Sequence, residues 1–188
     1  MKTVTRYPLS ISLLHWLLAV ALIGNLIVGL LLDDNEDLVS LHKSIGIFIL
    51  GLVAVRVVNR LRTRQRLPLS VNPAGTLNHH AERTVHGLLY LLMLVIPLLG
   101  WMKTNAAGHT ANCFGLFSLP TLVPKDRALS HWLGEVHALT AYGLAALVGF
   151  HVLAALVHRL IRMENILPRI LPWSTRADQH QARTEDIG

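Results

Sequence analysis

The sequence predicts an all-α protein, an integral membrane four-helix bundle. Hydrophobic residues make up 52% of the 188 residues, and the mean hydropathy of the chain is positive. Apolar residues are concentrated in four runs, at residues 10–32, 41–59, 84–102 and 133–161. A helix needs about 20 mostly apolar residues to cross the hydrocarbon core of a bilayer, so each run predicts one transmembrane helix. We expect one transmembrane domain over residues 1–172, followed by a polar, disordered tail at 173–188.

The first three runs each carry a feature that could argue against a membrane span. The first run lies near the amino terminus, but it is longer than the hydrophobic region of a signal peptide, and no small-residue cleavage motif precedes Asp33. The second is apolar from Ser44 to Val55 and then reaches Arg56, which must either extend to the interface or find a partner. The third contains Pro97, where we expect a kink. We therefore keep all three runs as spans.

Lysine and arginine are unevenly distributed among the segments that join the spans. If the amino terminus is cytoplasmic, thirteen of the 17 basic residues lie on the cytoplasmic side, and the outer side holds only Lys43, Lys103, Lys125 and Arg127. An excess of basic residues marks the cytoplasmic side of a membrane protein, so both termini are expected there. The basic residues do not form one continuous amphipathic surface, which argues against nucleic acid as a partner.

The fourth run carries His137 and His151 within an otherwise apolar segment. Fourteen residues of α-helix advance about 1,400°, close to four full turns, so both imidazoles leave the same face roughly 21 Å apart. Ionisable side chains within a membrane span almost always face the interior of the bundle. Small or aliphatic residues lie between the two histidines on this face, as a flat hydrophobic macrocycle would require. The pattern predicts a haem-binding face.

Two further histidines match these two depths. The first helix enters from the cytoplasmic side and carries His15 about one turn in, while the second enters from the outer side and begins near His42. We therefore expect His15 to pair with His151, and His42 with His137, each pair holding one haem iron. Because bis-histidine ligation fills both axial positions of the iron, this chemistry transfers electrons rather than binding gas. The lone Cys113 excludes a CxxCH attachment motif, so the prediction is two non-covalent b-type haems.

Two other residues are expected at the cytoplasmic depth. Arg56 follows His42 by fourteen residues and so faces the interior, where it could neutralise a haem propionate; the alternative is that it extends to the interface. His86, at the start of the third span, could contact a propionate or a quinone, or could simply pack at the interface.

The chain resembles a known family in four stretches: ISLLHW, LHKSIGIFILGLVAVRVVNR, HGLLYLLMLVIPLLGW and HWLGEVHALTAYGLAALVGFHVLAALVH. These are similar to segments of the bacterial cytochrome b561 family, four-helix di-haem b proteins of the inner membrane, and the likeness extends to about residue 172. The resemblance implies haem ligation at the positions of His15, His42, His137 and His151, in the same two pairs. It also implies localisation in the bacterial cell inner membrane.

The resemblance further implies electron transport from a periplasmic donor, a small molecule or a protein, to the quinone pool. A member of the family is associated with oxidising superoxide and reducing ubiquinone, so a quinone-reducing oxidoreductase of this type is the expected activity. Superoxide is an anion, whereas the outer segments mix basic residues with an acidic cluster at residues 33–37. One alternative is a haem relay or anchor subunit that serves a separate dehydrogenase. Another is a metal or proton transporter, which would show no visible absorption.

Overall fold

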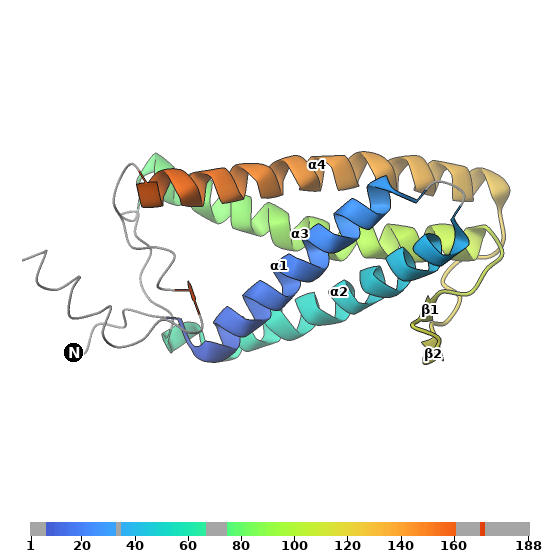
Figure 1. Ribbon diagram of the computed structural model, residues 1–188, viewed down its shortest axis with the longest axis horizontal. Coiled ribbons are helices and arrows are strands. Elements are labelled where there is room, and N and C mark those ends of the chain that lie inside the picture. Colours follow the sequence, from blue (N-terminus) through green and yellow to red (C-terminus); the bar gives the residue numbers. More distant parts are fainter. Residues whose placement is uncertain (1–6, 33–34, 67–74, 161–169, 172–188) are drawn as a thin grey trace, which may run out of the picture.

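The protein is a bundle of four long helices that run along its longest axis (Figure 1). The computed structural model describes residues 7–32, 35–66, 75–160 and 170–171. The helices are α1 (Leu9–Leu30), α2 (Glu36–Arg62), α3 (Leu77–Ala106) and α4 (Arg127–Leu160), and a short 3-10 helix, η1 (Arg64–Arg66), follows α2. The predicted all-α fold is confirmed. The predicted tail at 173–188 lies outside the described residues.

Three of the helices begin several residues before the predicted spans, because polar side chains cap their first turns. The side chain of Asn35 accepts hydrogen bonds from the backbone N–H groups of residues 37 and 38, and that of Thr76 accepts one from the N–H of residue 79. Asp126 does the same for the N–H of residue 129 at the start of α4. These caps lie outside the apolar runs, so the helices extend beyond the membrane-crossing segments. Helix α3 continues through Pro97.

The core forms where the helices pack closely. The closest backbone packing joins α3 to α4, α1 to α2, and α2 to α3. The buried apolar cluster draws on all four helices and includes Leu18, Ile49, Val53 and Leu144, of which Val53 and Leu144 are 0% and 1% exposed. The backbones of α1 and α4, and of α2 and α4, approach each other less closely than those three pairs. The predicted histidine pairs join these two more widely separated pairs of helices.

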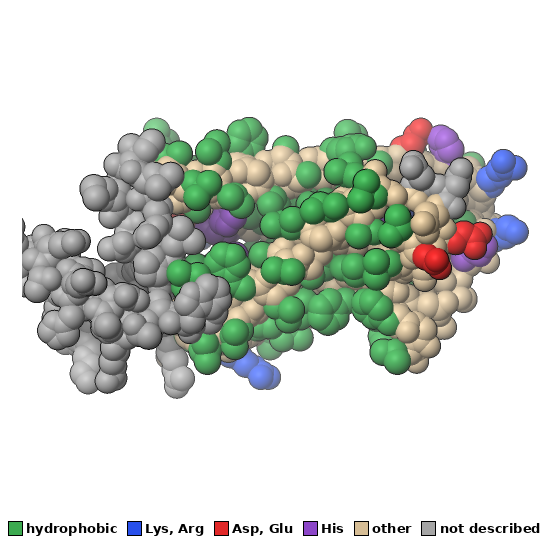
Figure 2. Space-filling model, viewed as in Figure 1, with side chains coloured by type: hydrophobic (Ala, Val, Ile, Leu, Met, Phe, Trp, Pro, Cys, Tyr) green, Lys and Arg blue, Asp and Glu red, His purple; other side chains and the backbone are tan. Residues whose placement is uncertain are grey.

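The outer surface of the bundle is apolar. Each of the four helices is long and apolar enough to span a bilayer, and large hydrophobic side chains are exposed on all of them. Hydrophobic side chains cover the middle of the face shown in Figure 2, whereas most of the charged side chains in view lie toward one end. A broad apolar surface around four helices of this length is what lipid requires, so the chain is a multi-pass membrane protein.

A small β-hairpin covers one end of the bundle, between α3 and α4. Strands β1 (Asn112–Cys113) and β2 (Phe117–Ser118) pair antiparallel, and the turn places Phe114 and Gly115 at positive φ. The buried hydroxyl of Ser44 on α2 accepts a hydrogen bond from the N–H of Phe114 at 3.0 Å. This contact holds the hairpin against the first turns of α2. We call this end of the bundle the hairpin end, and the other end, where α1 begins, the amino-terminal end.

Candidate functional site

At the hairpin end, His42 and His137 face each other across the space between α2 and α4. Their ring centroids are 6.0 Å apart and their planes are inclined by 80°. Nδ1 of His42 lies 3.2 Å from the carbonyl oxygen of Asn25, and Nδ1 of His137 lies 3.0 Å from that of Ile96. A carbonyl oxygen only accepts, so both Nδ1 atoms carry the proton and both Nε2 atoms keep a free lone pair. This is the tautomer that binds a metal, with the second nitrogen held by the protein.

The separation of the two rings also suits a shared metal atom. Metal–imidazole nitrogen bonds are about 2.0–2.1 Å long, and rings with centroids 6.0 Å apart can be joined by one atom between them. The arrangement can therefore supply two axial nitrogen ligands from two different helices.

Two glycines make room for these imidazoles. A Cβ at Gly29 would lie 3.1 Å from Cε1 of His42, and a Cβ at Gly100 would lie 3.1 Å from Cε1 of His137. Both distances are shorter than ordinary van der Waals contact, so a side chain at either position would push the ring from its place. The glycines thus fix each ring against the backbone of a neighbouring helix.

A cavity of about 270 Å³ adjoins the His42–His137 pair. Its walls are mainly apolar side chains of α1 to α4, as a flat hydrophobic ligand requires. Asn25 also lines it, is only 8% exposed, and its Oδ1 has no hydrogen-bond partner among the described residues. A buried acceptor without a partner is costly, and only a group that donates a hydrogen bond would satisfy it. The two imidazole donors and the apolar lining of the cavity are the chemistry that a haem requires at this end.

At the amino-terminal end, Arg56 is the centre of a buried polar cluster. It is 8% exposed, and its Nε donates to the hydroxyl of Tyr90 at 2.9 Å. Its Nη1 donates to the carbonyl oxygen of Ile11 at 3.3 Å, and its Nη2 to Nδ1 of His15 at 3.2 Å. No carboxylate pairs with Arg56 among the residues that the structure describes. The guanidinium is hydrogen-bonded, but its charge is not neutralised.

His151 lies in the same cluster, next to a histidine that was not in the predicted pair. The ring centroids of His86 and His151 are 5.3 Å apart, and Nδ1 of His86 donates to the carbonyl oxygen of Glu82 at 2.8 Å. His15 is near enough to interact electrostatically with both rings. The structure thus brings His15, His86 and His151 together, and its close ring contact here is between His86 and His151.

The hydrogen bond to Arg56 has a consequence for His15. A guanidinium only donates, so Nδ1 of His15 accepts and its proton is on Nε2. For Nε2 to bind a metal, the proton must move to Nδ1, and Arg56 must then find another acceptor. Any anionic group of a ligand in this cluster would provide that acceptor.

Buried apolar residues separate the two histidine clusters. Leu144 lies midway between His137 and His151 on α4 and is fully buried, together with Ile49 and Val53 from α2. The two clusters are therefore distinct sites near opposite ends of the bundle, as the spacing of histidines on α4 predicts.

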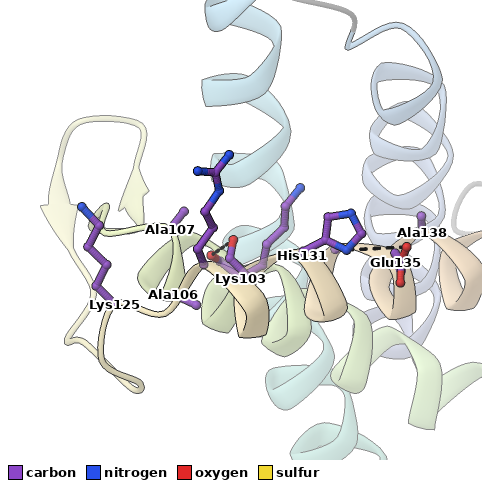
Figure 3. A pocket seen from close by; sticks show the side chains of 10 residues that line it. Lys103, Ala106, Ala107, Lys125, His131, Glu135 and Ala138 are labelled. Atoms are coloured by element: carbon purple, nitrogen blue, oxygen red, sulfur yellow. Dashed lines mark hydrogen bonds and ion pairs between the residues drawn. The ribbon is translucent and has the colours of Figure 1, made fainter.

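A second pocket, of about 780 Å³, opens at the hairpin end beside α4 (Figure 3). The cationic side chains that line it are Lys103, Lys125 and Arg127. Its one carboxylate, Glu135, lies 3.6 Å from Nδ1 of His131. We call this the outer basic pocket, because it lies outside the cavity that adjoins His42 and His137.

Sequence reasoning missed several residues of these sites. Tyr90 and the two glycines at positions 29 and 100 gave no signal, because their roles depend on contacts between helices. Asn25, an isolated amide within an apolar run, could have been found, since polar residues in a span are rarely without a function.

The fold and the two clusters define a class of protein: a helical membrane protein with histidines paired inside the bundle. The sequence profile of the family described as prokaryotic cytochrome b561 matches residues 6–173. The chain belongs to the prokaryotic cytochrome b561 family, whose members are membrane proteins that bind b-type haem.

Curated relatives agree with this assignment. Cytochrome b561 homolog 2 of Escherichia coli K12 is 30% identical over 178 residues, which cover 90% of this chain and 93% of the relative. The probable superoxide oxidase CybB of Yersinia pestis is 30% identical over 132 residues, 70% of this chain and 73% of that protein. Cytochrome b562 of Cereibacter sphaeroides is 26% identical over 170 residues, 84% of this chain and 90% of that protein.

A glycine substitution tests the fit at the hairpin end. Gly100→Ala should lower haem content and broaden or shift the spectrum of one haem, because the new methyl group displaces the His137 ring by a few tenths of an ångström. Gly87→Ala on the same helix is the matched control, since a Cβ there meets no atom within 4 Å. Pyridine haemochrome titration and visible spectra of the purified proteins give the comparison. Equal haem content and equal spectra in both variants would contradict the assignment.

Proposed function

We propose that this chain is a di-haem b-type electron-transfer protein that accepts electrons from a periplasmic donor and reduces membrane quinone. The observation that carries the proposal is the facing pair of His42 and His137 at the hairpin end. A second cluster of histidines, which includes His151 on the same helix as His137, supports a further haem at the other end. Haem iron with two axial imidazoles supplies reversible one-electron chemistry without an open coordination site. The positive-inside distribution of Lys and Arg supports a periplasmic position for the hairpin end.

The residues of each cluster would hold one haem. At the hairpin end, His42 and His137 would be the axial ligands, since both present Nε2 with a free lone pair. At the amino-terminal end we propose His15 and His151. Arg56 would then release His15 and pair with a propionate, which provides the acceptor that its uncompensated charge requires. Burial of a charged side chain within a span is costly unless the charge has a partner, so an Arg56 that is 8% exposed argues for such a role.

The outer basic pocket supports an anionic donor, and superoxide is the donor we propose. The sequence places acidic residues at 33–37 on the same side, but the described members of that cluster, Glu36 and Asp37, do not line the pocket. The pocket adjoins the His42–His137 cavity, because Lys103 and Ala107 line both. Two superoxide anions would supply the two electrons for one quinone, which takes up two protons.

An alternative function is a relay or anchor subunit for a separate dehydrogenase. The exposed apolar tip of the β-hairpin, where Leu116 and Phe117 are accessible, offers a contact for a partner protein. Reconstitution of the purified chain distinguishes the two functions. With superoxide and a quinone, the chain acting alone should form quinol, whereas a relay without its partner should form none.

The ligand pairs are tested by single substitutions. His137→Ala should lose the haem at the hairpin end and retain much of the other, and His151→Ala should do the reverse, because each imidazole would hold a different haem. Pyridine haemochrome assays with iron counting should give about half of the wild-type haem in each variant, and low-temperature spectra should show which haem remains. Equal loss of the same spectral component in both variants would contradict two separate pairs.

Arg56 is tested through a redox potential. Arg56→Leu should lower the potential of the inner haem without abolishing haem binding, because the positive charge favours the reduced iron. A tenfold fall in the reduced fraction corresponds to about 59 mV for a one-electron couple. Tyr90→Phe removes one hydrogen-bond partner of Arg56 but keeps the charge, so its effect should be smaller. If the redox titration of the Arg56→Leu protein equals that of wild type, Arg56 does not act on the haem and merely extends to the interface.

The donor is tested through the outer basic pocket. Replacement of Lys125 and Arg127 together by Gln should slow superoxide-dependent quinone reduction roughly tenfold at low ionic strength and weaken its salt dependence, because electrostatic attraction of the anion is lost. Stopped-flow reduction of the haems gives the rate, and the haem spectra should be unaltered. If neither the double substitution nor added salt changes the rate of haem reduction by superoxide, the outer basic pocket does not attract superoxide electrostatically.

A further inference from the structure

Lys103 occupies an unusual position between the two pockets at the hairpin end. It lies in the last turn of α3 and lines both the cavity beside His42 and His137 and the outer basic pocket. The sequence places Lys103 only among the basic residues of the outer side. The structure places it at the wall of the cavity that adjoins the two imidazoles.

The packing of α3 against α4 directs the Lys103 side chain. Lys103 follows Gly100 by three residues, so the two lie on the same face of α3, and Gly100 is the residue that contacts the His137 ring. The stem of Lys103 crosses α4 at Gly134, where a Cβ would lie 3.3 Å from its Cε and 3.7 Å from its Nζ. Gly134 precedes His137 by three residues. The ammonium group is therefore held about one helical turn from the imidazole.

A second cation lies at the same cavity. Lys43 follows His42 directly and lines the same cavity as Lys103. No aspartate or glutamate is among the described residues that form this lining. Two ammonium groups gathered without a carboxylate call for an anionic group on whatever enters the cavity.

We propose that Lys103, together with Lys43, pairs with the propionates of the haem held by His42 and His137, and that this pairing raises the potential of that haem. The inference rests on the proposed function and extends it to the polar edge of the outer haem. A haem carries two propionates, and the cavity offers two ammonium groups. Lysine binds an anionic oxygen as a point charge, and its positive charge favours the reduced iron.

The competing role for these lysines is contact with lipid headgroups. Both lie near helix ends, and a lysine there can extend to the membrane surface and contribute nothing to a bound group. Headgroup contact would leave the haem potential independent of Lys103. A propionate pair would make the potential depend on the charge.

The experiment is a redox titration of full-length protein carrying Lys103→Met, with Lys43→Met and the double variant measured in parallel. The outer haem is identified as the one lost in His137→Ala. Lys103→Met should lower the potential of the outer haem by about 59 mV, which corresponds to a tenfold fall in the ratio of reduced to oxidised haem. The double variant should lower this potential further. Lys103→Arg should restore most of the potential. Lys125→Met is the matched control, because Lys125 lines the outer basic pocket but not the cavity. In this variant the potential of the outer haem should equal that of the wild-type protein.

Each outcome decides the matter. An unaltered outer potential with full haem content in Lys103→Met overturns the proposal and favours headgroup contact. If Lys103→Met loses the outer haem but Lys103→Arg retains it, the positive charge is what matters, which supports the pairing with a propionate. If both variants lose the outer haem, the proposal is overturned and Lys103 has a packing role. Absence of b-type haem from the wild-type protein would instead refute the proposed function itself.

Discussion

Polar groups within a membrane span must find their partners inside the protein, and the rest of this structure depends on that constraint. Lipid offers no hydrogen bonds, so imidazoles and a guanidinium are tolerated only where other helices meet them. Here His42 and His137 bond to backbone carbonyls of α1 and α3, and Arg56 bonds to His15 and Tyr90. Every one of these contacts joins different helices. The polar groups therefore fix how the four helices are arranged.

The uneven packing of the helices makes binding sites possible. The helices α3 and α4, α1 and α2, and α2 and α3 pack closely, whereas α4 stays further from α1 and α2. Predicted imidazole pairs span these wider separations, and a buried apolar layer with Leu144 at its centre divides the two ends. A flat cofactor can occupy such a space where direct helix contact would close it. Small residues at positions 29 and 100 bring the rings against neighbouring backbones.

The two ends of the bundle differ in where their cationic side chains lie relative to the histidines. At the amino-terminal end a single buried cation, Arg56, contacts a histidine directly. At the hairpin end the cations Lys43 and Lys103 line the cavity, and further basic side chains surround an open pocket outside it. Positive charge near an iron favours its reduced form, so under the proposed function these arrangements would set the potentials of the two haems separately.

The sequence by itself determined the four spans and the depths of His15, His42, His137 and His151 along the bundle, because these depend on hydropathy and helical periodicity along one chain. The orientation expected from Lys and Arg stays a prediction. The predicted helix ends were less accurate than the predicted spans, because capping side chains extend the helices beyond the apolar runs. The tertiary structure alone decided which groups meet: His86 beside His151, Arg56 on His15, and the stem of Lys103 across Gly134. These contacts depend on the rotation and separation of whole helices, which periodicity within a single helix does not specify.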